Sequence, residues 1–333
     1  MIIDRPGPVR LVQVDGRLPN LALMRLSHWL KAQGREVVFT RSVNRTPDEP
    51  DYATVLGSAI FKFSDARVEK LRTNFPGAIV GGTGGDDLIT VERLIGDYEH
   101  YDYSLYPEFP FSIGFTQRGC RPACEFCVVP KKEGKPRSVN TIHGIWRGPG
   151  YPKKIHLLDN DFFGNPHWRE RIAEIREGDF KVCFNQGINV RILSNEVARA
   201  LATIQYRDDQ FQRRRLYTAW DNIGDERIFF RGVDRLEQAG VPGKHLMAYM
   251  LIGFDPAETW GAIFHRFRRM TDRGILPYPM VFDHTRRDLK RFQRWVVTGL
   301  YRAVAFEDYD ASIRRAPAPT ILPRQLVTWA LAA

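Results

Sequence analysis

Short apolar stretches alternate with segments of helical periodicity along most of this chain of 333 residues. In its first part, strands are expected at residues 9–14, 36–40, 54–60 and 78–80. Pro19 is expected to begin a helix, because proline suits a first helical position, and Gly34 to end it. Alternating strands and helices with short turns predict a parallel sheet covered by helices. We therefore expect a small, doubly wound, Rossmann-like α/β domain over residues 1–105.

The same alternation resumes after a link rich in tyrosine and proline at residues 98–110. Further strands are expected at 111–116, 154–158, 181–185, 216–220, 245–252 and 278–282, with helices at 168–177, 195–203, 225–239 and 258–273. Six such units without a dinucleotide-binding signature fit an incomplete (β/α)6 TIM-like barrel, whose chemistry lies at the carboxyl ends of its strands. The predicted fold class is thus α/β, with this barrel over residues 106–285. A C-terminal helical extension at 286–333 begins with a helix over 288–305.

The net charge of +10 is unevenly distributed, with −1 over residues 1–105 and +11 over residues 106–333. A basic surface attracts phosphate-rich partners such as nucleic acid, although it also serves ordinary solubility. Candidate phosphate contacts lie at residues 131–137, 213–215, 265–269 and 286–291. A run of charges is more often a solvated surface, and no RNA-binding signature accompanies these runs.

Three of the four cysteines lie within eight residues, in the stretch Gly119–Cys127. The chain starts without the apolar core of a signal peptide and has no apolar run of the roughly 18 residues that span a membrane. We therefore expect a soluble cytoplasmic protein without membrane contact. In that compartment crowded thiols indicate metal binding or redox chemistry rather than disulfides.

The crowded cysteines Cys120, Cys124 and Cys127 have the spacing C-x3-C-x2-C and directly follow the strand at 111–116. Three thiolates on one loop can each bind one iron of a [4Fe–4S] cube, which leaves the fourth iron open for chemistry. The alternative is a structural zinc site completed by His143, although such sites usually pair their ligands in two separated turns. The fourth cysteine, Cys183, lies within an apolar strand and is expected to be a small buried residue without a cluster role.

This motif, on the loop after the first strand of a partial barrel, resembles the radical S-adenosylmethionine (SAM) superfamily. The resemblance implies that the open iron chelates SAM. It also implies that reduction by a donor such as flavodoxin or ferredoxin yields methionine and a 5′-deoxyadenosyl radical, which abstracts hydrogen from a substrate. Phe126, directly before Cys127, would pack near the adenine. Stretches such as GFTQRGC and FNQGINVRI also resemble a group of radical SAM proteins that supplies a superfamily but no substrate, and the catalytic residues stay unassigned.

Polar residues that follow the later strands are the expected SAM contacts, because the carboxyl ends of barrel strands face the cofactor. The superfamily often has a Gly-Gly-Glu type motif after the second strand, which this chain lacks, so Asp159 or Asn160 would replace it. The full set expected to bind SAM, besides Phe126, is Asp159, Asn160, Asn185, Gln186, Asn189, Arg191, Asp221 and Gly253. Each also has a plainer interpretation, since Asn and Asp after strands often cap helices and form turns.

The amino-terminal domain resembles the cobalamin-binding domain of some radical SAM enzymes. The basis is Gly81-Gly82 after a late strand, together with Gly57 and Ser58. The Asp-x-His-x-x-Gly signature of histidine-ligated cobalamin is missing, and glycines after strands also form plain turns. Two functions stay open as alternatives to a radical SAM enzyme that only abstracts hydrogen. One is a cobalamin-dependent radical SAM methyltransferase, and the other is a zinc- or cluster-stabilised nucleic-acid-binding protein. Since no cysteine precedes Cys120 and none follows Cys183, a single cluster is expected.

Overall fold

The computed structural model describes residues 5–312, which divide into two compact units at residues 110 and 111. In the first unit, four parallel strands form a sheet in the order β2-β1-β3-β4. They are β1 (Val9–Gln13), β2 (Val37–Thr40), β3 (Thr54–Ser58) and β4 (Ile79–Gly81). The two central strands, β1 and β3, are wholly buried, as expected for a sheet covered on both faces.

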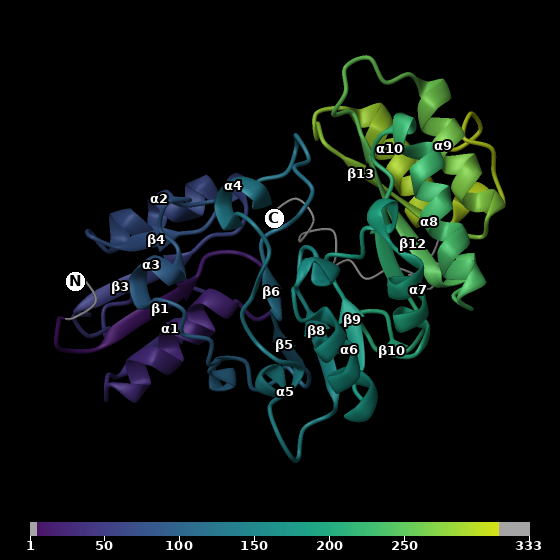
Figure 1. Cartoon of the computed structure of the whole chain (residues 1–333). Coiled ribbons are helices and arrows are strands. Elements are labelled where there is room, and N and C mark those ends of the chain that lie inside the picture. Colours follow the sequence, from purple (N-terminus) through teal and green to yellow (C-terminus); the bar gives the residue numbers. More distant parts are fainter. Residues whose placement is uncertain (1–4, 313–333) are drawn as a thin grey trace. The chain divides into compact units, whose positions relative to one another are not determined.

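Two helices cover the opposite faces of this first sheet (Figure 1). The helix α1 (Leu21–Ala32) connects β1 to β2 and α2 (Asp65–Asn74) connects β3 to β4, so the two right-handed crossovers run in opposite directions along the sheet. A further short helix, α3 (Val91–Ile95), follows β4. The prediction of a doubly wound α/β unit is therefore confirmed, except that no helix joins β2 to β3.

The helix α1 begins at Leu21, two residues later than its proline predicts. Asn20 is the N-cap, because its side-chain oxygen accepts from Leu23 N, and Pro19 precedes the cap. The Asn20 amide also donates to Ser58 Oγ at 2.8 Å, which ties the start of α1 to the end of β3. At the other end Gly34 has a φ of +74°, the left-handed conformation expected of a glycine after a helix.

Among its described residues, the second unit contains six longer parallel β-strands that alternate with helices, besides one parallel strand of two residues, so the predicted partial (β/α)6 fold is confirmed. They are β5 (Ser112–Gly114), β8 (Lys154–Leu157), β9 (Lys181–Phe184), β11 (Leu216–Ala219), β12 (Leu246–Ile252) and β13 (Leu276–Val281). They form two sheets, β10-β9-β8-β5 and β11-β12-β13, because the short strand β10 (Gln205–Tyr206) pairs with the start of β9. Past the end of β9, Ile188 N donates to Tyr217 O of β11 at 2.8 Å, which joins the two sheets.

Helices of this second unit pack on one face of its strands and form its core. They are α5 (Ile142–Ile145), α6 (Trp168–Glu177), α7 (Asn195–Ala202), α8 (Glu226–Gln238), α9 (Trp260–Asp272) and α10 (Arg287–Val297). Ile155 and Leu157 of β8 belong to this core. Since side chains alternate along a strand, His156 of β8 points to the opposite, inner face. On β9, Cys183 lies on that inner face and is fully buried, as predicted.

The helix expected over 288–305 is shorter in the structure. It ends at Val297, and Gly299 then takes a φ of +74°, so the chain continues as a single 3-10 turn at Leu300–Arg302. The rest of the C-terminal extension, residues 313–333, lies outside the described residues, and the boundaries at 105 and 285 stay predictions. Within residues 5–312, no helix is long and apolar enough to cross a membrane.

Candidate metal and cofactor site

The cysteine loop (residues 119–127) follows β5 and the two-residue strand β6 (Gln117–Arg118). Gly119 has a φ of +88°, and a Cβ there would lie 2.3 Å from Lys135 O, so only glycine fits this close approach of two backbone segments. The base of the loop is further fastened where Gly119 N donates to Glu133 Oε2 at 2.9 Å and Cys120 N donates to Gly134 O at 3.2 Å. Both acceptors belong to or follow α4 (Val129–Glu133).

The thiols of this loop meet the carboxyl ends of successive strands. Cys120 Sγ lies 4.0 Å from Asn160 O, which follows β8, and Arg191 Nη2, which follows β9, lies 3.7 Å from Cys124 Sγ. The Phe126 ring lies 5.6 Å from that of Phe254, just after β12. The cysteine loop therefore lies at the strand ends where barrel chemistry is expected.

All three cysteines of the loop are half-buried, while Cys183 is fully buried on β9. Burial, with the charge of Asp161 adding to it, raises the pKa of Cys120 to about 12. Burial likewise raises the pKa of Cys127. Without a cation the two groups are thus neutral thiols, and a metal that binds them as thiolates must release their protons.

His143, the expected fourth ligand of a zinc site, lies away from the cysteine loop. His143 lies on α5 and packs its ring edge against Phe180, 5.3 Å away, which precedes β9. It is therefore at the opposite end of that strand from the cysteine loop. Among residues 5–312 no group of three or more His, Cys, Asp or Glu side chains could hold a single metal ion. In a [4Fe–4S] cube each thiolate instead binds its own iron, so the three thiols of this loop can hold three of the four irons.

Asp159, an expected SAM contact, serves the fold. It is buried at the end of β8, and its carboxylate accepts from Thr116 N, Thr116 Oγ1 and Gln117 N at 2.7–2.8 Å. Burial raises its pKa to about 7, although these hydrogen bonds lower it. Asp159 thus fastens the chain just before the cysteine loop to β8. Its neighbour Asn160 is half-buried, and its amide donates to Glu133 Oε2 at 3.3 Å.

Asn185 is the expected SAM contact with an unused polar atom. It is buried at the end of β9 on the inner face, and its Oδ1 lies 3.1 Å from His156 Nδ1. Its Nδ2 is buried and has no hydrogen-bond partner among residues 5–312. Burial lowers the pKa of His156 to about 4, so the imidazole is neutral. An unsatisfied buried donor costs free energy unless a ligand oxygen pairs with it, so Asn185 Nδ2 is suited to a ligand. The adjacent Gln186, another expected SAM contact, is half-buried.

Arg191 connects the cysteine loop to two strand ends. Besides its contact with Cys124, its Nη1 donates to Asp225 Oδ2 at 2.7 Å and its Nε donates to Asn189 Oδ1 at 3.2 Å. Asn189 also caps the 3-10 turn at Val190–Ile192. Both predicted contacts therefore lie at the rim, joined to each other by one hydrogen bond.

The last two expected SAM contacts have structural partners. Asp221, after β11, accepts from Leu251 N at 2.9 Å and so joins the ends of β11 and β12. Gly253 has a φ of +78°, and a Cβ there would lie 2.6 Å from Leu289 Cδ1. The left-handed turn thus favours glycine here, and a larger residue would require the Leu289 side chain of α10 to shift.

Sequence reasoning missed two features beside the cysteine loop. Arg121 forms a bidentate pair with Asp161, with Nε and Nη2 at 2.6 and 2.8 Å from its two oxygens. Exposed Phe282, after β13, packs 5.0 Å from Phe254 and extends the aromatic contact of Phe126. The second aspartate of the stretch LLDNDF, Asp161, was the available signal for the ion pair with Arg121. The contact between Phe282 and Phe254 joins the ends of two strands and has no such local signal.

The glycines proposed for cobalamin pack against the chain itself. A Cβ on Gly82 would lie 2.3 Å from Ala59 O, and one on Gly81 would lie 2.4 Å from Ile89 O. Gly57 faces the side chains of α2 and β4, and Ser58 Oγ accepts from Asn20. Gly57 and Ser58 thus lie within β3 and Gly81 ends β4, where each packs against neighbouring segments of the first unit, and cobalamin binding stays a prediction.

The basic runs are partly used by the fold. Arg266 is fully buried, pairs with Glu258, and donates to Trp220 O and Leu251 O at 2.8 and 2.9 Å. Arg291 Nη2 donates to Phe306 O at 2.6 Å. These guanidinium groups hold strand ends and the chain after α10, and nucleic-acid binding stays a prediction.

No protein-family model matches the chain, and no curated protein matches it either. Among solved structures, the chain is similar to a mutant of spore photoproduct lyase with bound AdoMet and dinucleoside spore photoproduct. The two share 11% identity and a TM-score of 0.35, over 87% of this chain and 83% of that chain. With a likeness this loose, function has to be inferred from the residues of the site.

Proposed function

We propose that this protein is a radical SAM enzyme, with a [4Fe–4S] cluster bound by Cys120, Cys124 and Cys127. The observation that supports this most is that two thiols of one loop contact groups at the ends of β8 and β9. The fourth cysteine is buried within β9, so the loop offers only three thiolates and one iron stays free for SAM. Such a cluster, once bound and reduced, would supply the electron that cleaves the C5′–S bond of SAM to methionine and a 5′-deoxyadenosyl radical, and this radical would take a hydrogen atom from an organic substrate.

The chain's own residues would prepare this site in distinct ways. Asp159 holds Thr116 and Gln117, which fixes the segment that leads into the cysteine loop. Arg191 donates to Cys124 Sγ and thereby orients that sulfur. Phe126 is exposed beside Phe254 and offers an aromatic surface on which an adenine can stack. On the inner face, Asn185 Nδ2 is a buried donor for an oxygen of SAM or of the substrate.

The test is anaerobic reconstitution with iron and sulfide, followed by reduction, addition of SAM and quantification of 5′-deoxyadenosine. We expect about four iron and four sulfide per chain and formation of 5′-deoxyadenosine. A triple variant with Cys120→Ala, Cys124→Ala and Cys127→Ala is expected to lose the cluster and the product. Cys183→Ala is the matched control and is expected to keep both, because Cys183 lies outside the loop.

Two results would contradict this function. The first is tightly bound zinc without a cluster in protein purified under the same conditions. The second is a loaded, reduced cluster whose electron paramagnetic resonance (EPR) spectrum is unchanged by SAM and which forms no 5′-deoxyadenosine. The spectral measurement does not require the natural substrate, because SAM that binds the open iron alters the spectrum directly.

A further inference from the structure

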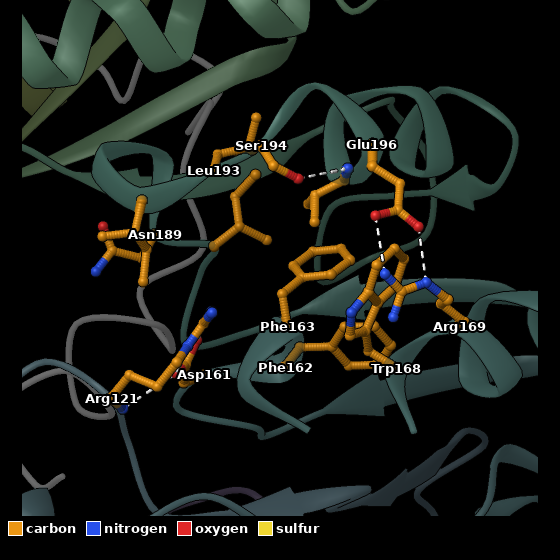
Figure 2. A pocket seen from close by; sticks show the side chains of 13 residues that line it. Arg121, Asp161, Phe162, Phe163, Trp168, Arg169, Asn189, Leu193, Ser194 and Glu196 are labelled. Atoms are coloured by element: carbon orange, nitrogen blue, oxygen red, sulfur yellow. Dashed lines mark hydrogen bonds and ion pairs between the residues drawn. The ribbon is translucent and has the colours of Figure 1, made fainter. Parts of the chain in front are cut away.

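A pocket of about 180 Å³ lies next to the cysteine loop, between the chain after β8 and the chain after β9 (Figure 2). Phe162, Phe163 and Trp168 line it from the first side. Ile188, Leu193 and Val197 line it from the second. The pocket is smaller than the roughly 300 Å³ at which sites for whole drug-sized ligands begin, so it suits a single ring.

Aromatic edges form much of the wall. The Phe162 and Phe163 rings lie 5.0 Å apart, and the Phe163 and Trp168 rings 5.4 Å apart, both in edge-to-face arrangements. Phe163 is only half-buried, so part of its ring faces the pocket. A further aromatic ring would extend this cluster in the geometry that aromatic pairs favour.

Two ion pairs lie on opposite sides of the pocket (Figure 2). On one side Arg121 pairs with Asp161, at 2.6 and 2.8 Å. On the other side Arg169 pairs with Glu196, at 2.7 and 2.9 Å. Each pair is bidentate and neutral overall, so neither offers a ligand a net opposite charge. A charged ligand is therefore disfavoured.

Ile192 also lines the pocket and leaves 47% of its surface exposed. A ring that enters the pocket would cover it and gain the free energy of that apolar burial. From the apolar walls, the aromatic edges and the neutralised charges together, we propose that this pocket binds an uncharged aromatic ring.

The pocket adjoins the proposed metal site through one residue. Arg121 directly follows Cys120, and its backbone N donates to Asp161 Oδ2 at 3.1 Å, so the same carboxylate borders both. If the proposed radical SAM function holds, the ring belongs to a substrate whose remainder extends to the cysteine loop. Binding of the ring itself requires no cluster, and it is tested on the protein without one.

The test is fluorine NMR of the full chain with three probes of equal size. We expect para-fluorobenzyl alcohol to bind saturably with a Kd of about 1 mM. The anion para-fluorobenzoate and the cation para-fluorobenzylamine are expected to bind about tenfold more weakly, because each loses hydration of its charge without meeting a net opposite charge in the pocket. Phe163→Ala is expected to weaken binding of the alcohol about tenfold and Ile192→Ala about fivefold.

Ile223→Ala is the matched control for Ile192→Ala. Ile223 is also on a 3-10 turn after a strand, is 44% exposed, and does not line the pocket, so its variant is expected to bind the alcohol unchanged. Absence of saturable binding, an equal loss in Ile223→Ala, or tighter binding of either charged probe would overturn the proposal. Because Ile192 is exposed, its variant keeps the test valid even if Phe163→Ala fails to fold. Failure here leaves the 5′-deoxyadenosine assay unaffected, so the two proposals fail separately.

Discussion

Arg191 touches a thiol of the cysteine loop and also pairs with Asp225, an acid that follows β11. Its two terminal nitrogens are divided between Cys124 Sγ, at 3.7 Å, and Asp225 Oδ2, at 2.7 Å. Hydrogen bonds to cluster sulfurs are among the factors that set the reduction potential of an iron–sulfur centre. A cationic donor stabilises the reduced cluster more than the oxidised one, because reduction adds negative charge. Arg191 is therefore a positioning residue with an electrostatic effect that can be measured.

Arg191→Met is expected to lower the midpoint potential of the reconstituted cluster by about 50 mV, which corresponds to a hydrogen bond of about 1 kcal/mol. The measurement is a redox titration followed by EPR. Arg199→Met removes the same charge from an exposed position on α7 and is expected to leave the potential unchanged. Equal shifts in both variants, or no shift in Arg191→Met, would contradict a direct role for the contact with Cys124.

At this scale the sequence predicts what is local. The spacing of Cys120, Cys124 and Cys127 is a local property, and so is the burial of Cys183 in an apolar strand. The partners of polar residues are not local, because Asp159 binds a segment 42 and 43 residues away and Arg191 contacts Cys124 over 67 residues. Polar residues after the strands therefore pointed to the strand ends that the cysteine loop contacts. Polarity alone could not separate side chains used by the fold from those left for a ligand.

At the scale of elements, Asp102 ties α1 to the chain that precedes the second unit. Its Oδ2 accepts from Ser27 Oγ at 2.6 Å and lies 2.7 Å from Lys31 Nζ, while its Oδ1 accepts from Ser104 N at 2.9 Å. Burial alone would raise its pKa, but the hydrogen bonds from Lys31, Ser104 and Ser27 outweigh it and lower the pKa to about 2. The ionised form therefore stabilises the folded state.

Asp102→Asn is expected to lower the free energy of unfolding at pH 7 by about 1–2 kcal/mol, a value reduced because Lys31 is half-exposed. Since the folded pKa lies below the ordinary value of 3.8, this stability is present above pH 4 and is lost as pH falls toward 2. Urea unfolding of both proteins from pH 7 to pH 3 is the measurement. If the free energies of unfolding of the wild type and Asp102→Asn differed by a constant amount over this pH range, Asp102 would not act through its charge.

Whether a segment is a strand or a helix was predictable here, because each buries an apolar face whose spacing differs between the two and is visible in the sequence. The division of the second unit into two sheets was not, since it depends on the pairing of β10 with the start of β9 across 24 residues. The true end of α10 at Val297 was visible in Gly299, whose left-handed conformation stops the helix, but apolar spacing beyond it favoured a longer one. Turn chemistry should therefore outweigh periodicity when the two disagree.

At the scale of the whole molecule, the two compact units have separate cores. Leu71 of α2 is fully buried in a core of the first unit, and Leu201 of α7 is fully buried in the core of the second. Each is a helical leucine with no exposed surface, so substitution by alanine should cost each unit about 3 kcal/mol through lost burial and a cavity. Because separate cores can open separately, each substitution is expected to destabilise its own unit.

Hydrogen exchange of native amides, read by mass spectrometry on peptides from each unit, tests this independence. Leu71→Ala is expected to speed exchange in β1 and β3 about a hundredfold while β8 and β9 keep their wild-type rates, and Leu201→Ala is expected to do the reverse. The first variant should also retain the iron and sulfide of the cysteine loop after reconstitution, since that loop belongs to the second unit. If Leu71→Ala sped exchange equally in both units, they would unfold as one, and the amino-terminal unit would be part of the support for the cysteine loop rather than a separately stable module.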